Sequence, residues 1–187
     1  MTLFVGIDLE TTGLDWATGH RIIEVAAIIY REDETRVGAY VQRIDPERAI
    51  DPKAQAVHGI SYEELSMCPK WEAVAPKLHA LLSKCDEAVA HNGRGFDAPF
   101  LIHEFDRVGL SVPSCLHRCV DTMVDGRWAT PMGKLPNLGE FAFATGTPYD
   151  VAQAHGAEYD VMVMMQAFFA ARKWGYFNAI NTARSAA

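Results

Sequence analysis

Apolar residues near the start of the chain are concentrated in three runs that are rich in β-branched side chains. The runs cover Leu3–Leu9, Arg21–Tyr30 and Val37–Ile44. Such runs, bounded by polar turn residues, predict β-strands. Thr12 and Gly13 follow the first run, and the polar turn Arg31–Thr35 precedes the third. Three consecutive strands joined by short turns predict an antiparallel meander.

Further along the chain, apolar residues recur every three or four positions, which is the spacing of helices that bury one face. This spacing predicts helices at Trp71–Leu82, Phe96–Val108, Asn137–Ala144 and Glu158–Trp174. Two short apolar runs predict buried strands at Ala88–Ala90 and Leu116–Val120, and the Pro-containing stretch Asp45–Ile60 predicts a loop. This order of elements predicts an α/β fold in which helices pack on a mixed sheet.

A chain of 187 residues suits a single domain. We expect this domain to span residues 1–175, followed by a frayed tail at 176–187, where the last residues are small and polar. The first ten residues contain acids and no basic segment, unlike a secretory signal. The longest apolar stretch, Val161–Ala171, contains Gln166 and is well short of the ~20 residues that span a membrane. The sequence therefore predicts a cytoplasmic protein without a membrane segment.

Charge and cysteine content narrow the function classes. The chain has 17 Lys and Arg residues against 24 Asp and Glu, a formal net charge of −7. This balance excludes a protein that coats long nucleic acid nonspecifically, because that mode needs Lys and Arg to neutralise phosphates. It is compatible with a nucleic-acid enzyme whose acids bind metal ions. The 4 cysteines predict reduced thiols, since Cys115 and Cys119 have no second Cys or His pair at a zinc-like spacing.

Asp8 and Glu10 lie two positions apart at the end of the first predicted strand. Alternate residues of a strand share a face, so both carboxylates project on the same side. Neighbouring carboxylates on a buried strand repel each other without a cation, and their hard oxygens suit Mg²⁺ or Mn²⁺ rather than zinc. Solvated acids at the end of an edge strand are the alternative, and this segment alone leaves both interpretations open.

Two further segments carry an acid at the start of a predicted helix. Asp97 follows the loop that begins at His91, and it lies in a first helical turn, where a carboxylate is favoured electrostatically. Asp160 enters the last helix, and His155 lies in a Gly-containing loop about one turn ahead of it. His155 can therefore turn toward whatever Asp160 binds. Taken singly, Asp97 is better explained as a helix-end acid, and His155 as an ordinary loop histidine.

Taken together, these segments resemble the DEDD superfamily of 3′→5′ exonucleases, to which the proofreading subunit of bacterial DNA polymerase III is related. The four acids of the family pattern correspond to Asp8, Glu10, Asp97 and Asp160. One branch carries a Tyr four residues before the last Asp, and the other carries a His five residues before it. Gly156 and His155 occupy these positions here, so the chain resembles the His branch, DEDDh. The resemblance runs from Leu3 to Phe169 and includes GHRIIE at 19–24, VHGI at 57–60 and DT at 121–122.

The resemblance implies an RNase H-like fold, with a mixed five-stranded sheet whose first three strands are antiparallel and which helices flank. It also implies catalysis with two Mg²⁺ or Mn²⁺ ions. In this scheme Asp8 bridges both ions, and Glu10 and Asp160 complete one site. Asp97 holds the second ion directly or through water, and His155 is the general base that takes a proton from the attacking water.

The resemblance also implies a set of substrate contacts. Its members lie in the segments around the acids: Thr11, Thr12, Gly13, Leu14, His58, Asn92, Phe96 and Lys134. Leu14 would wedge against the terminal base, and Lys134 would meet the next phosphate. A solvated loop residue is the alternative for His58 and for Lys134. Lys53 departs from the pattern, because the polymerase subunit has an acid there that is thought to meet the terminal sugar.

The sequence therefore predicts a two-metal-ion 3′–5′ exonuclease that releases nucleoside 5′-monophosphates from the 3′ end of single-stranded nucleic acid, with DNA preferred over RNA. An RNA-trimming exoribonuclease of the same family and a catalytically silent nucleic-acid-binding module are the alternatives. A phosphate loop of the sugar-kinase and actin type is excluded, because Glu10 stands where that loop needs Gly. No polymerase or repair partner is evident from the sequence, since no clamp-binding motif and no polymerase-binding tail are recognisable after Trp174.

Overall fold

The computed structural model describes residues 2–154 and 156–178, and in this part of the chain a five-stranded mixed sheet forms the centre. The strands are β1 (Leu3–Thr11), β2 (Ile22–Arg31), β3 (Arg36–Arg43), β4 (Glu87–Ala90) and β5 (Val120–Asp121). They lie in the order β3-β2-β1-β4-β5. The first three strands pair antiparallel, while β4 pairs parallel with both β1 and β5. The predicted mixed sheet with an antiparallel meander is therefore confirmed.

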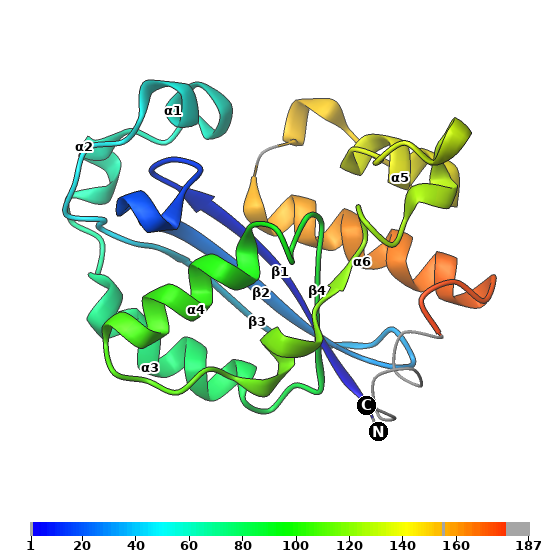
Figure 1. Ribbon diagram of the computed structural model, residues 1–187, viewed down its shortest axis with the longest axis horizontal. Coiled ribbons are helices and arrows are strands. Elements are labelled where there is room, and N and C mark those ends of the chain that lie inside the picture. The colour runs from blue at the N-terminus through cyan, green and yellow to red at the C-terminus, as the bar shows by residue number, and fades with distance from the viewer. Residues whose placement is uncertain (1, 155, 179–187) are drawn as a thin grey trace.

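Helices cover both faces of this sheet (Figure 1). They are α1 (Pro52–His58), α2 (Tyr62–Leu65), α3 (Trp71–Leu82), α4 (Asp97–Arg107), α5 (Leu138–Thr145) and α6 (Ala157–Lys173). Short 3₁₀ turns are η1 (Trp16–Thr18), η2 (Ser114–Arg118), η3 (Arg127–Ala129), η4 (Pro131–Gly133) and η5 (Val151–Gln153). One core lies between the sheet and α3 with α4, and the other lies between the sheet and α6 with α5.

Strand β1 alternates between these two cores, as its sequence predicts. Val5, Ile7 and Leu9 enter the core with α3 and α4, whereas Phe4 enters the core with α6. Gly6 shares the face of Phe4, and a Cβ at this position would lie 2.6 Å from Met165 Cγ. The absence of a side chain at Gly6 thus lets α6 lie directly against β1. This close approach decides where the first turn of α6 meets the strand.

Two of the predicted elements are wrong. The stretch Asp45–Ile60, expected as a loop, contains α1, which Asp51 caps by accepting the Lys53 N–H at 2.8 Å and which Gly59 ends at a φ of 73°. Its apolar pattern is absent because α1 buries none of its residues. The strand expected at Leu116–Val120 is mostly the turn η2, in which the Cys115 thiol donates to the Leu82 carbonyl at 3.3 Å, and only Val120 belongs to β5.

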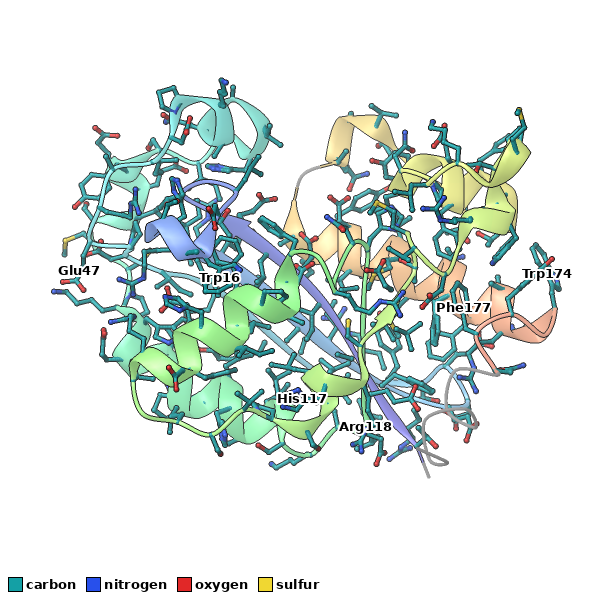
Figure 2. All side chains as sticks on the ribbon, viewed as in Figure 1. Trp16, Glu47, His117, Arg118, Trp174 and Phe177 are labelled. Atoms are coloured by element: carbon teal, nitrogen blue, oxygen red, sulfur yellow. The ribbon has the colours of Figure 1, made fainter. Side chains whose placement is uncertain are left out.

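The C-terminal segment packs on the second core as far as it is described. The Tyr176 ring stacks on Trp128 with centroids 3.9 Å apart, and Phe177 is only 7% exposed. Figure 2 shows Phe177 pointing inward beside α6, with Trp174 at the outer edge. Residues 179–187 of the expected tail lie outside the described residues, so the domain boundary stays a prediction. Within the described chain, no helix combines the length and the apolar character needed to cross a membrane.

Candidate active site

Three elements bring the four predicted acids to the C-terminal end of β1. Asp8 and Glu10 are on β1, where the antiparallel register sets Asp8 opposite Ala26 and Glu10 opposite Glu24 of β2. Asp160 lies in the first turn of α6, the helix that Gly6 allows against β1. Asp97 is the first residue of α4 and is 4% exposed. The charges of Asp97, Glu10 and Asp160 all contribute to raising the pKa of Asp8.

The loop that carries Asp97 is tightly folded. Asn92 has a φ of 69°, and a Cβ at Gly93 would lie 2.9 Å from Cys119 Sγ. Asp121, which is fully buried at the end of β5, holds this loop by accepting the N–H groups of Asn92 at 3.1 Å and Arg94 at 3.0 Å. The sequence analysis singled out 121–122 only as a family match. The sequence does carry a signal for this anchoring role. It is an acid at the end of a short buried strand, next to the loop that follows the neighbouring strand.

Burial, with the charges of nearby acids, raises the pKa values of three of the predicted acids. Burial, reinforced by Asp97 and Glu10, raises the pKa of Asp8 well above its usual value. Burial and then Glu24 raise the pKa of Glu10 to about 8. Burial also raises the pKa of Asp97 to about 7, with the charge of Asp121 adding to the effect. The protein alone therefore retains protons on this cluster at neutral pH, and a bound divalent cation would relieve the repulsion.

The donor set at this end of the sheet fits a hard divalent cation. All four predicted ligands are carboxylates, which suit Mg²⁺ or Mn²⁺ better than zinc. Among the described residues, however, no three His, Cys, Asp or Glu side chains are already drawn together as a ligand group. His155, the predicted general base, lies outside the described residues. The buried position of Asp97 and the raised pKa values of Asp8 and Glu10 are the observations that favour a cation here.

Two cavities flank the acids. The first, which we call the Glu10 cleft, has a volume of about 550 Å³ and is lined by β1, the η1 region, α1 and Phe96. The second, the Asp160 cleft, has a volume of about 770 Å³ and is lined by Asp160 together with α5 residues such as Glu140 and Phe143. Figure 1 shows α1 beyond the end of β1 and α5 alongside α6. One space thus borders Glu10 and the other borders Asp160, and both are of the size that ligands occupy.

Five of the eight predicted substrate residues line the Glu10 cleft: Thr11, Gly13, Leu14, His58 and Phe96. Thr12 does not line it, because this residue is fully buried and its hydroxyl accepts the Arg21 N–H at 3.0 Å. Asn92 is also outside the lining, and its N–H donates to Asp121. Lys134 forms an ion pair with Glu140 at 2.8 Å, at the border of the Asp160 cleft.

His58 enters the Glu10 cleft from the end of α1 with a defined tautomer. Its Nδ1 accepts the Ile60 N–H at 3.0 Å, so the proton of the neutral ring is on Nε2. Burial lowers the pKa of this ring and favours the neutral form. The Nε2 atom is buried, and the ring hydrogen-bonds to the Thr11 backbone. His58 therefore lines the cleft with a ring that its neighbours already hold in place.

Comparison with known protein families shows to which class of protein this chain belongs. Residues 5–168 match the family described as Exonuclease. The chain belongs to this exonuclease family. The enzyme class predicted from the sequence, a 3′–5′ exonuclease, is confirmed by this match and by the relatives described next.

The relatives of the exonuclease chain include polymerase subunits. It is 30% identical over 164 residues to the DNA polymerase III subunit epsilon of Rickettsia felis, a match that covers 87% of this chain and 70% of that protein. It is 27% identical over 176 residues to the same subunit of Escherichia coli, covering 91% and 71%. It is also 30% identical over 160 residues to the 3′-5′ exonuclease DinG of Bacillus subtilis, where it covers 86% of this chain and 16% of that protein.

Solved structures of exonuclease I have the same fold. One superposes with a TM-score of 0.79 at 21% identity and covers 96% of this chain and 42% of that chain. E. coli exonuclease I in complex with a dT13 oligonucleotide gives a TM-score of 0.76 at 22% identity, covering 90% and 40%. The exonuclease chain therefore spans less than half of the exonuclease I structures. The RNase H-like fold predicted from the sequence is confirmed.

Proposed function

We propose that the chain is a two-metal-ion 3′–5′ exonuclease that releases nucleoside 5′-monophosphates from single-stranded 3′ ends, with DNA preferred over RNA. The observation that carries this proposal is the set of four carboxylates, drawn from β1, α4 and α6, at one end of the sheet between two clefts. Exonuclease I structures with bound dT13 and dA16 oligonucleotides support single-stranded DNA as the substrate class.

Each of the four acids would contribute to one or both of two cation sites. Asp8, the central acid of β1, would contact both, while Glu10 and Asp160 would complete one site and Asp97 the other. Mg²⁺ or Mn²⁺, when bound, supplies positive charge at the phosphoryl oxygens and lowers the pKa of a water. Asp121 would keep Asp97 in place through the loop that it anchors. His155, whose role is assigned from the sequence alone, would accept the proton of the attacking water.

The substrate would cross the acids from one cleft to the other. The Glu10 cleft suits the terminal nucleotide, since Val57 and Phe96 give it apolar walls and Leu14, 84% exposed, stands at its side. Apolar and aromatic contacts can hold any of the bases, so they impose no sequence preference. The upstream strand would then lie in the Asp160 cleft, close to Phe143 and to the ion pair of Lys134 with Glu140.

Removal of metal ions is expected to abolish the activity. EDTA should reduce cleavage to background, and excess Mg²⁺ or Mn²⁺ should restore it, because the carboxylates repel the phosphate without cations. Ca²⁺ should support little cleavage, since its longer and looser coordination displaces the reacting groups. Initial rates on 5′-labelled single-stranded DNA give the measurement. Zn²⁺ belongs among the ions compared, because one exonuclease I structure was obtained in a zinc-bound form. Full activity in EDTA would contradict the proposal.

A closed circular single strand tests the requirement for an end. The linear strand should be shortened from its 3′ terminus with release of nucleoside 5′-monophosphates, while the circle of the same sequence should persist. Parallel strands of DNA and RNA measure the preference between the two, which we expect to favour DNA. Cleavage of the circle would indicate an endonuclease, and faster cleavage of RNA would favour the exoribonuclease alternative.

A further inference from the structure

One lysine lines the Glu10 cleft. Lys53 lies in the first turn of α1, and its side chain is exposed. Its backbone N–H donates to Asp51, but its ammonium group forms no ion pair within the described chain. The remaining charged residues of the lining are acids: Glu10, Asp15 and Asp51. Lys53 is therefore available to pair with an anion that enters the cleft.

The two aspartates of this lining are already engaged. The Asp15 carboxylate accepts the Ala17 N–H at 2.9 Å, and the Asp51 carboxylate accepts the Lys53 N–H at 2.8 Å. Each one caps the start of a helical turn. Glu10 is assigned to a cation in the proposed function. The acids of the cleft thus have partners of their own, and they do not occupy the Lys53 ammonium.

The two histidines of the lining are engaged. The His58 ring accepts the Ile60 N–H at Nδ1 and hydrogen-bonds to the Thr11 backbone. The His20 ring also lines the cleft, and its Nδ1 lies 3.1 Å from the Thr12 hydroxyl. Lys53 is therefore the cationic donor that this lining offers, and such a donor suits a phosphate better than a neutral hydroxyl.

We propose that the Glu10 cleft accepts a terminal nucleotide that carries a 3′-phosphate, with the Lys53 ammonium as its donor. This inference rests on the proposed function, because it assumes that the terminal nucleotide occupies this cleft. It adds a substrate class, 3′-phosphorylated ends, and a product class, nucleoside 3′,5′-bisphosphates.

The reaction is the same hydrolysis, with a different leaving nucleotide. The water oxygen forms a bond to the phosphorus between the last two nucleotides, and the bond from that phosphorus to the O3′ of the penultimate nucleotide breaks. One proton of the water passes, through the general base, to this O3′. The shortened strand then ends in a 3′-hydroxyl, and the terminal nucleotide leaves as a nucleoside 3′,5′-bisphosphate.

A comparison of two ends on one oligonucleotide tests the inference. The exonuclease, Lys53→Gln and Lys53→Glu are each given the same single-stranded DNA with a 3′-hydroxyl or a 3′-phosphate, and kcat/KM is measured for release of the first nucleotide. Lys77→Glu, an exposed lysine on α3, is the control for the same change of charge away from the cleft. Mass spectrometry of the first product distinguishes a bisphosphate from free phosphate.

We expect the unaltered exonuclease to remove the 3′-phosphorylated nucleotide as a bisphosphate. A hydrogen bond between charged groups contributes about 1.5–3 kcal/mol, so loss of Lys53 should lower the ratio of kcat/KM values, phosphate over hydroxyl, by about tenfold or more. Lys77→Glu should leave the ratio unchanged. Because the ratio compares two substrates on one preparation, partial unfolding of a variant does not alter it.

Three results would contradict the inference while the proposed function stands, as long as the 3′-hydroxyl end is degraded. They are refusal of the 3′-phosphate end by the unaltered exonuclease, release of inorganic phosphate before any nucleotide, and an unchanged ratio in Lys53→Glu. If neither end is cut in Mg²⁺ or Mn²⁺, the proposed function itself is wrong, and the inference fails with it.

Discussion

Asp8→Asn should reduce kcat/KM of the exonuclease by more than about 10³-fold. Asp8 is the acid proposed to contact both cations, and cations at a phosphoryl group supply several kcal/mol of transition-state stabilisation. Each 1.36 kcal/mol corresponds to a factor of about ten in rate. The measurement is the initial rate on 5′-labelled single-stranded DNA in saturating Mg²⁺, together with Mn²⁺ binding by calorimetry. Asp106→Asn, an exposed acid on α4, is the matched control and should keep both properties.

The same substitution should stabilise the metal-free protein at high pH. Burial and neighbouring acids raise the pKa of Asp8 in the folded state, so the folded protein binds a proton that the unfolded chain has released. The stability that comes from this proton is fully present at low pH and is lost as the pH rises through the folded-state pKa. The pKa of Glu10 is raised to about 8 and that of Asp97 to about 7. The acid cluster should therefore lose folding stability over the range from about pH 4 to 8.

Thermal unfolding in EDTA measures this effect. The wild-type melting temperature should fall between pH 5 and pH 8, and the fall should be smaller in Asp8→Asn, because the amide has no proton to lose. Asp106→Asn should follow the wild type. If Asp8→Asn instead melts well below the wild type at both pH values, Asp8 has a structural role that the proposed mechanism does not include.

His155→Ala should lower the exonuclease rate by about 10²–10⁴-fold, which is the usual contribution of a general base. Binding of Mn²⁺, measured by calorimetry, should stay close to that of the wild type, since the assigned ligands are carboxylates. The activity of the wild type should rise with pH through the range in which a histidine titrates, near ~6.5.

His117→Ala provides the control for this variant. His117 is exposed on η2 and is well separated from the end of β1 (Figure 2), so its removal should change neither rate nor binding. If His155→Ala loses Mn²⁺ binding while Asp160→Asn retains it, the roles proposed for these two residues are exchanged.

Elements with strong local patterns were predicted well from the sequence. Helix α3 begins and ends where its apolar spacing predicts, at Trp71 and Leu82, because five of its residues are buried on one side. The three antiparallel strands were recognised because their apolar runs are long and the turns between them are short. Helix α1 was missed, since it is seven residues long and buries none of them. Its real signals are terminal ones, namely the Asp51 cap, Pro52 at the first position and Gly59 at the end.

The predicted site residues could be recognised from short segments of the sequence. The alternation of β1 sets Asp8 and Glu10 on one face, and the order of the acids with His155 identifies the exonuclease family, which the family match confirms. These properties depend on residues that are close in sequence, where periodicity and motif spacing can be recognised directly. The residue roles inferred from the motifs, that of His155 included, stay predictions.

Only the tertiary structure decided which residues surround those acids. It placed Lys53, on a helix without an apolar pattern, in one cleft with Glu10 and the predicted contact His58, and it set fully buried Asp121 under the loop of Asp97. It also separated Thr12 and Asn92 from the lining of that cleft. Such contacts join segments far apart in the chain, and they arise from packing against the sheet. A single sequence records the residue types that make the chemistry, whereas the distances between them exist only in the folded chain.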